Sequence, residues 1–203
     1  FEAEGSSYND ILRLRNLTSR NNLQLHVKIG GVEAIRDIID CLEIGVDGII
    51  GPMVESSFGA KKFVNSLEKL EAKDLFHSSI NIETKNGLLE LDDILNITAG
   101  NISNITIGRS DLSGSYMNKS ITANSSFIAE KVIFIAKAAK VFGLSVTMGG
   151  NVNVKTLEVF KEHQSLKDLL DKVETRKVII PVKIFIDNPK VLDEAIKFEE
   201  LYV

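Results

Sequence analysis

The amino-acid sequence predicts an α/β protein of the (β/α)8 barrel (TIM-barrel) class. Three observations lead to this prediction. Short apolar runs alternate with segments of helical periodicity along the chain, which is typical of parallel βα units. The strand-like runs carry apolar side chains on one side and polar side chains on the other. No glycine-rich dinucleotide-binding turn and no P-loop follows any of them.

The predicted elements follow from these two periodicities. In the segment 32–43, for example, Ile35, Ile38, Ile39 and Leu42 recur at the spacing of one helix face. The expected strands are Leu23–Gly31, Val46–Val54, Ser78–Lys85, Asn104–Asp111, Leu144–Gly150 and Lys172–Ile180, with "FEAEG" at 1–5 as the tail of another. The expected helices are Tyr8–Ser19, Val32–Glu43, Ser56–Leu70, Leu88–Ile97, Ser125–Phe142, Val154–Leu170 and Pro189–Tyr202.

Side-chain alternation favours a closed barrel over an open, doubly wound sheet. Ile80 and Ile82 lie on one side of their strand and Asn81 and Glu83 on the other, and three further runs alternate in the same way. Strands covered by helices on both faces are apolar on both sides, so this pattern favours a barrel with a polar interior. Seven strands are visible, and we expect a first strand and helix to precede Phe1. We find no linker and expect a single domain over residues 1–203.

Composition and charge exclude several classes of function. The 203 residues are 44% hydrophobic and carry a net charge of −4, with an isoelectric point near 5.5. Nucleic-acid binding needs a basic surface, and a membrane span needs about 18 consecutive apolar residues; the sequence has neither. Cys41 is the single cysteine, which is typical of a reducing compartment, and we see no signal peptide. We therefore expect a cytoplasmic protein that binds neither nucleic acid nor membrane.

The carboxyl ends of the expected strands carry the candidate functional residues, because catalytic groups of β/α barrels collect there. Glu83 and Asp111 end two different strands. Two carboxylates with room left for water and substrate are typical of a Mg²⁺ or Mn²⁺ site. Lys28 and Arg109 could hold an anionic substrate, and the small residues beside Arg109 leave room for backbone N–H groups to approach it. The alternative is that these charges form structural ion pairs at the barrel rim.

Three stretches, "GVDGIIGPMVES", "INIETKNGLLELDDIL" and "ITIGRSDLSGS", occur in an order and spacing that resemble a known family. It is the aldolase/citrate lyase family of the phosphoenolpyruvate/pyruvate barrel superfamily, which includes metal-dependent (class II) pyruvate aldolases. The resemblance covers residues 1–180. It implies that Glu83 and Asp111 bind the divalent metal, and that the backbone at 108–111 receives the carboxylate of a 2-oxo acid. It also implies that Lys28 polarises the keto and enolate oxygens. The substrate-binding residues expected are Lys28, Gly108, Arg109 and Ser110.

Three departures from the family's pattern affect the predicted chemistry. The Glu-His that often ends the second barrel strand is here Glu4 followed by glycine, so either Glu4 or a water on the metal acts as the base. Lys28 replaces an arginine and lacks its bidentate fork. Arg109 replaces an uncharged residue, which indicates a more anionic substrate, phosphorylated or dicarboxylic, or an ion pair with Glu55 or Glu83.

The resemblance implies a metal-dependent carbon–carbon lyase of the aldolase type, acting on a pyruvate-derived or other 2-oxo acid through an enolate. Three alternatives stay open: citrate-lyase-type acyl-CoA ester cleavage, phosphoenolpyruvate chemistry, or a catalytically degenerate barrel that only binds. The partner expected is a small acidic molecule. Family members usually form homo-oligomers, often by exchanging the C-terminal helix. The segment Pro181–Val203 either does this or packs under its own barrel.

Overall fold

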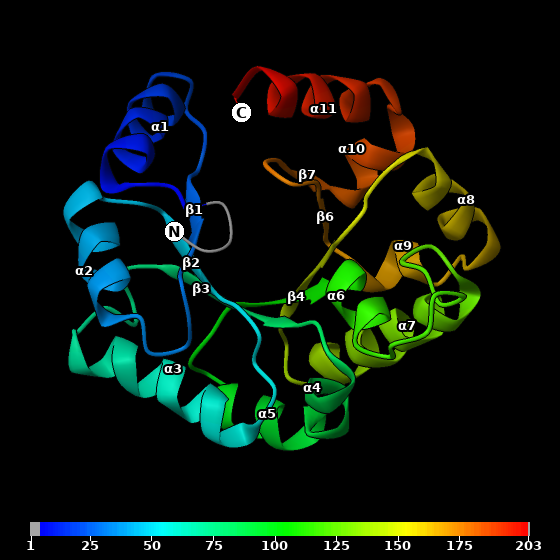
Figure 1. The fold of residues 1–203 in the computed structure, drawn as a ribbon, viewed down its shortest axis with the longest axis horizontal. Helices are drawn as coiled ribbons and strands as arrows, with labels where there is room; N and C mark the ends of the chain where they lie inside the picture. The colour runs from blue at the N-terminus through cyan, green and yellow to red at the C-terminus, as the bar shows by residue number, and fades with distance from the viewer. Residues whose placement is uncertain (1–4, 203) are drawn as a thin grey trace. The chain divides into compact units, whose positions relative to one another are not determined.

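The computed structural model describes residues 5–202, in which strands and helices alternate as the sequence predicts (Figure 1). The strands are β1 (His26–Lys28), β2 (Gly48–Gly51), β3 (His77–Ile82), β4 (Asn104–Gly108), β5 (Ser145–Gly149), β6 (Lys172–Glu174) and β7 (Ile179–Pro181). The helices are α1 (Tyr8–Arg20), α2 (Ile35–Ile44), α3 (Ser57–Lys69), α4 (Lys85–Leu89), α5 (Leu91–Thr98), α6 (Arg109–Gly114), α7 (Ser126–Val141), α8 (Val154–Glu162), α9 (Leu166–Leu169), α10 (Val182–Asp187) and α11 (Lys190–Tyr202).

The order of the strands in the sheet is their order in the chain, β1 to β7. Strands β1, β2 and β3 pair in parallel, with His26 opposite Gly48 and Gly48 opposite His77. Strands β5 and β6 also pair in parallel. Sequential parallel strands joined by helices are the arrangement of the TIM-barrel class, so the predicted fold class is confirmed.

The last part of the sheet differs from the prediction of one strand over Lys172–Ile180. The structure has two short strands here, β6 and β7, which pair antiparallel. Four residues separate them, and the Thr175 N–H donates to the Val178 carbonyl at 2.9 Å across the turn. A parallel crossover needs a dozen or more residues, so this short connection forms a hairpin. The strand tail predicted at 1–5 falls, apart from Gly5, outside the described residues.

Several helices also differ from their predicted extent. The helix predicted over 88–97 is divided into α4 and α5, and the helix predicted over 154–170 into α8 and α9. Helix α6 begins at Arg109, inside the strand predicted over 104–111, and α10 was not expected. The backbone leaves the extended conformation at Gly108 (φ −85°, ψ 88°), and Asp111 lies in the first turn of α6, where a carboxylate is favourable.

The chain divides into two compact units. The first unit runs to Asn81 and includes Glu90–Asn104, and the second comprises Ile82–Leu89 and the chain from Ile105 onward. In the first unit, α1 packs against α2 and α3 packs against α5 (Figure 1). In the second, α7 packs against β5, α6 and α9, and α10 packs against β6, β7 and α11. The single domain, and the exchange of Pro181–Val203 between subunits, stay predictions.

Each unit has its own apolar core between strands and helices. Val27, Ile49 and Ile80 of the first unit are buried, as are Ile107 and Val146 of the second. The polar side chains predicted to alternate with them are also buried. These are Ser79, Asn81, Glu83, Asn104, Thr106 and Thr147. The polar side of the strands is therefore buried within each unit, and in the first unit the Asn104 amide donates to Ser79 Oγ at 2.8 Å.

In each unit, an aspartate that immediately precedes one strand is hydrogen-bonded to the backbone at the start of the neighbouring strand. Asp47, before β2, accepts hydrogen bonds from the Leu25 amide at 2.8 Å and from the Arg15 guanidinium at 2.6 Å. Asp171, before β6, accepts from the Val146 amide at 2.7 Å and from a lysine ammonium of α7 at 2.6 Å. The same carboxylate thus binds the neighbouring strand and a covering helix. Such charge-assisted bonds set the register at the amino ends of the strands.

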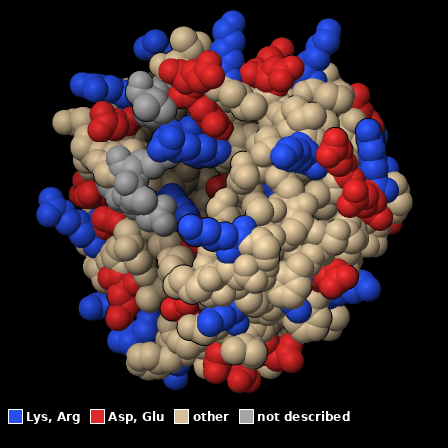
Figure 2. Space-filling model, turned by 45° about the vertical axis from the view of Figure 1, so that its right-hand side comes forward, with Lys and Arg blue, Asp and Glu red and all other residues tan. Residues whose placement is uncertain are grey.

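Within the described residues, every helix is too short or too polar to cross a membrane. On the face shown in Figure 2, Lys and Arg side chains lie interspersed with Asp and Glu side chains. The cytoplasmic location stays a prediction.

Candidate functional site

The first feature of the candidate site is the close packing of Glu83 against Gly108. Glu83 directly follows β3, Gly108 ends β4, and Glu83 is only 2% exposed. A β-carbon at Gly108 would lie 2.5 Å from Glu83 Oε2 and 2.7 Å from Glu83 Cβ. Only glycine leaves room for the glutamate here, so the carboxylate is held against the end of β4.

A hydrogen bond reinforces this contact between the two strand-end segments. The Lys85 N–H donates to Ser115 Oγ at 2.9 Å, and Ser115 Oγ in turn donates to the Leu112 carbonyl at 2.7 Å. The segment after Glu83 is therefore tied to α6, whose first turn carries the exposed Asp111. The structure brings the two predicted carboxylate-bearing segments together, one carboxylate buried and the other exposed.

The chemistry of this donor set fits a hard divalent cation. Carboxylate oxygens are the ligands that Mg²⁺ and Mn²⁺ prefer. Among the described residues there is no group of three or more His, Cys, Asp or Glu placed to hold a metal ion. Glu83 and Asp111 could thus supply two ligands, and water and substrate oxygens would have to supply the rest.

The turn after β5 covers the start of α6. Gly150 has a positive φ of 78°, and a β-carbon there would lie 2.5 Å from the Ser110 nitrogen and 2.7 Å from the Arg109 nitrogen. Both the backbone conformation and the space require glycine. The backbone of Arg109 and Ser110 therefore lies close to Gly150, and the side chain of Ser110 is exposed.

The side chain of Arg109 does not extend into solvent as a substrate ligand would. It is 1% exposed, and all five of its N–H groups donate to neutral acceptors of the protein. No donor is left for the substrate that we expected the side chain to bind. The alternative ion pair with Glu55 or Glu83 is not formed either, because every donor is already used. Burial lowers the pKa of Arg109 to about 10, so the guanidinium stays charged at neutral pH.

The remaining predicted residues belong to the first unit. Lys28 ends β1 and is partly buried, on the same side of the strand as His26 and opposite the buried Val27. This placement at a carboxyl end agrees with its predicted position. Glu4, the predicted base, lies outside the described residues.

Sequence reasoning missed Asn124 and Thr156 as members of the site region. Asn124 Oδ1 accepts hydrogen bonds from Arg109 at 2.9 Å and from Thr156 Oγ1 at 3.1 Å. Thr156 Oγ1 also accepts from the Asn153 N–H at 3.1 Å, which completes the capping box of α8. The Asn-x-x-Thr spacing at 153–156 was the one available signal, and it indicates a helix start rather than a contact to Arg109.

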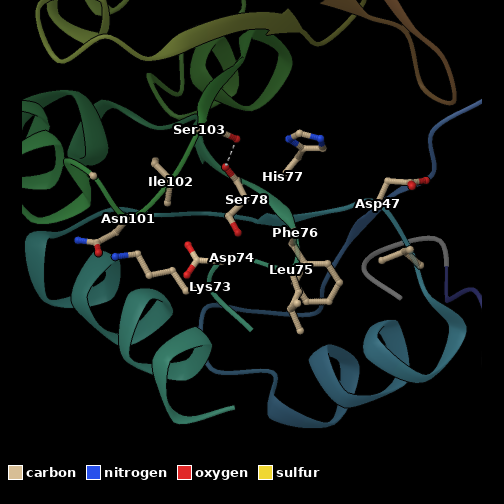
Figure 3. A pocket seen from close by; sticks show the side chains of 12 residues that line it. Asp47, Lys73, Asp74, Leu75, Phe76, His77, Ser78, Asn101, Ile102 and Ser103 are labelled. Carbon is tan, nitrogen blue, oxygen red and sulfur yellow. Dashed lines mark hydrogen bonds between the residues drawn. The ribbon is translucent and has the colours of Figure 1, made fainter. Parts of the chain in front are cut away.

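A pocket of about 460 Å³ lies at the opposite ends of the strands, in the first unit (Figure 3). It is lined by residues that precede or begin β2, β3 and β4, among them Asp47, Asp74, Ser78 and Ser103. Ser103 Oγ donates to the Ser78 carbonyl at 3.1 Å (Figure 3). In β/α barrels the amino ends of the strands carry stability and the carboxyl ends carry catalysis, so this pocket is not the candidate active site.

Fold and site together define a β/α-barrel protein with acidic residues at the carboxyl ends of adjacent strands. The chain belongs to the HpcH/HpaI aldolase/citrate lyase family, which matches over residues 14–163. This confirms the predicted family, and it supports a lyase-type enzyme. None of the curated proteins compared with the chain matches it.

Several solved structures share this fold. An HpcH/HpaI aldolase from Desulfitobacterium hafniense is 14% identical, with a TM-score of 0.67 over 97% of this chain and 80% of the aldolase. RipC from Yersinia pestis is 19% identical, with a TM-score of 0.62 over 91% and 83%. The protein CitE from Mycobacterium tuberculosis, in complex with magnesium and acetate, is 14% identical, with a TM-score of 0.57 over 90% and 75%. Identities this low show the shared fold alone.

Proposed function

We propose that the protein is a divalent-metal-dependent carbon–carbon lyase that cleaves or forms an aldol bond of a 2-oxo acid. The observation that carries this proposal is the pairing of two strand-end segments, one with Glu83 held against Gly108 and one with Asp111. Hard oxygen donors at the carboxyl ends of barrel strands suit a cation that also contacts an acidic substrate. Family membership supports the same reaction class.

A structural relative adds support for the metal and for the substrate class. CitE from Mycobacterium tuberculosis has been solved with magnesium together with acetate, and with magnesium together with acetoacetate. Both organic ligands are small carboxylic acids, and the second is an oxo acid. We therefore assign Mg²⁺ or Mn²⁺ as the cation and a short oxo acid as the substrate.

Each residue of the proposed site has a distinct task. Glu83 and Asp111 would hold the cation, which when bound would stabilise the negative charge that develops on the substrate oxygen. The backbone at Gly108 and Ser110 would orient the substrate carboxylate. Lys28 would place a positive charge beside the keto oxygen, whose charge grows as the enolate forms. Glu4 is our proposed base, because the histidine that often follows it in the family is absent.

Thermal unfolding with Mn²⁺ and oxalate tests this proposal, because oxalate mimics the enolate of pyruvate. A ligand present at 100 times its Kd stabilises a protein by about 2.7 kcal/mol, which is easily measured as a rise in Tm. We expect Mn²⁺ plus oxalate to raise the Tm of the natural protein. Glu83→Gln and Asp111→Asn should each abolish the rise while keeping the fold.

Glu55→Gln is the matched control, because Glu55 is an exposed carboxylate after β2 that the proposed site does not use. It should keep the full rise in Tm. The proposal fails if the natural protein shows no rise, or if Glu83→Gln and Asp111→Asn keep it. Screening aldehydes for pyruvate-dependent consumption then identifies the reaction partner, and absence of any turnover together with intact oxalate binding would favour a barrel that only binds.

A further inference from the structure

Arg109 is the largest fully buried side chain among the residues that the structure describes. Its guanidinium uses every N–H group it has. Nε donates to the Gly149 carbonyl (3.1 Å), Nη1 to the Ala123 carbonyl (3.3 Å) and Asn124 Oδ1 (2.9 Å), and Nη2 to the Gly150 carbonyl (2.9 Å) and Thr156 Oγ1 (3.3 Å).

All five acceptors are neutral, which is unusual for a buried cation. Among the residues that the structure describes, no carboxylate forms an ion pair with Arg109. Removing a charge from water is costly, and here only carbonyl, amide and hydroxyl dipoles offset that cost. A hydrophobic residue would fill the same space without the cost of removing a charge from water. The specific contribution of the guanidinium is therefore the set of hydrogen bonds that it makes.

Those contacts join three separate segments to the start of α6. One is the end of β5 and the turn after it, at Gly149 and Gly150; the second is the segment before α7, at Asn124; the third is the first turn of α8, at Thr156. The turn after β5 comes so close that it tolerates no side chain at position 150. Arg109 therefore fixes the first turn of α6, in which Ser110 and Asp111 directly follow it.

We propose that Arg109 is a positioning residue: its guanidinium holds the turn at 149–150 and the start of α6 in one fixed arrangement, so that Ser110 is placed for the substrate and Asp111 for the cation. This inference rests on the proposed function and deepens it. Arg109 replaces an uncharged residue of the family's pattern, and the inference gives it the task of shaping the site instead of contacting the substrate. A fixed site binds more tightly because less ordering is required at binding.

Arg109→Lys tests the proposal, because lysine keeps the charge but has three donors and no planar fork. With Mn²⁺ present, calorimetric titration should show oxalate binding weakened about tenfold. Thr156→Val removes one acceptor of the network with almost no change of shape, and we expect it to weaken oxalate binding about threefold. Arg36→Lys, at an exposed arginine of α2, is the matched control and should leave oxalate binding unchanged.

Hydrogen exchange of the metal-free proteins supplies a readout that does not depend on activity. In Arg109→Lys and Thr156→Val, exchange should accelerate in peptides covering 109–115 and 149–153 and stay unchanged in β1, β2 and β3. A purely structural arginine would instead lower Tm and leave the Kd of oxalate unaltered. If Arg109→Lys does not fold, the Kd of oxalate and the hydrogen exchange of Thr156→Val test the positioning role in the same way.

The outcomes separate this inference from the proposed function. Oxalate binding by the natural protein, with a Kd within twofold of it in both Arg109→Lys and Thr156→Val, overturns the positioning role alone. No oxalate binding by the natural protein overturns the proposed function, and the inference with it. A weaker Kd in both variants, together with faster exchange confined to the two named segments, supports the inference.

Discussion

The carboxylate of Glu83 lies against the α-carbon of Gly108, so close that a methyl group at position 108 would stand 2.5 Å from Oε2. Glu83, one proposed metal ligand, can lie here only because Gly108 has no side chain. Gly108 belongs to the segment that carries the other proposed ligand, Asp111. A sequence comparison of the two strands separately would show only a glutamate and a glycine.

Gly108→Ala should displace Glu83 and abolish the rise in Tm that Mn²⁺ plus oxalate produces. Overpacking of this kind costs about 1–3 kcal/mol of stability, so Tm without ligand should also fall. Gly114→Ala, at the last residue of α6 and with open space around its α-carbon, is the control and should keep the ligand response. A normal response in Gly108→Ala would show that the position of Glu83 is unimportant for metal binding.

Lys28→Met should lower kcat for aldol cleavage about a hundredfold, because it removes the positive charge proposed to stabilise the enolate oxygen. Lys28→Arg should retain most of the activity, since it keeps the charge and adds the fork that the family commonly has. The measurement is steady-state kinetics with pyruvate release as the readout. Lys61→Met, at an exposed lysine of α3, controls for a general loss of charge, and equal kcat in Lys28→Met and Lys61→Met would remove Lys28 from the mechanism.

Gly48→Ala should destabilise the first unit, because the rings of His26 and His77 lie parallel on either side of Gly48, with centroids 6.1 Å apart. A β-carbon at position 48 would stand 2.5 Å from His26 Nδ1 and 2.8 Å from the His77 carbonyl oxygen. We expect a loss of about 2 kcal/mol, seen as a fall in Tm of roughly 4–8 °C. Gly31→Ala meets no atom within 4 Å and should leave Tm within a degree or two; equal values for the two variants would contradict the packing argument.

Asp171 should make the stability of the protein depend on acid pH. Partial burial by itself would raise the pKa of Asp171, but the hydrogen bonds from Lys140, the Val146 amide and Ser145 together lower it. The folded pKa of Asp171 thus lies below the unfolded one, so the stabilisation is complete above the unfolded pKa and is lost as the pH falls through the folded pKa.

Asp171→Asn removes this titration. We expect it to cost about 1 kcal/mol at pH 7, because solvent screens a partly exposed charge, and to cost progressively less as the pH approaches 3. Urea unfolding at pH 7, 5, 4 and 3 measures the difference between the two proteins. A difference that stays constant over this range would show that the charge of Asp171 contributes nothing.

Much of this architecture could be predicted because the two periodicities are local properties of the chain. Alternation in residues 78–85 and the apolar spacing in 32–43 placed β3 and α2 within a few residues of their observed bounds. The junction at Gly108 was placed too late, since the run Asn104–Asp111 contains no proline to mark the end of the strand, and the backbone already turns helical at Arg109. The hairpin of β6 and β7 was missed because its turn contains no Gly, Pro, Asn or Asp, the residues that usually mark a turn in a sequence.

The sequence by itself determined the fold class, because hydrophobic periodicity is a local property of the chain, and three of its stretches resembled those of the family. It also placed Lys28 at the end of β1 and Glu83 directly after β3, whereas Asp111 lies in the first turn of α6 and not on a strand. Only the tertiary structure decided what Arg109 does. Its five acceptors come from residues 14 to 47 positions further along the chain, and no local pattern relates them to it. The same holds for Gly108 and Gly150, whose necessity comes from atoms of other segments that approach within 2.5 Å of the missing β-carbon.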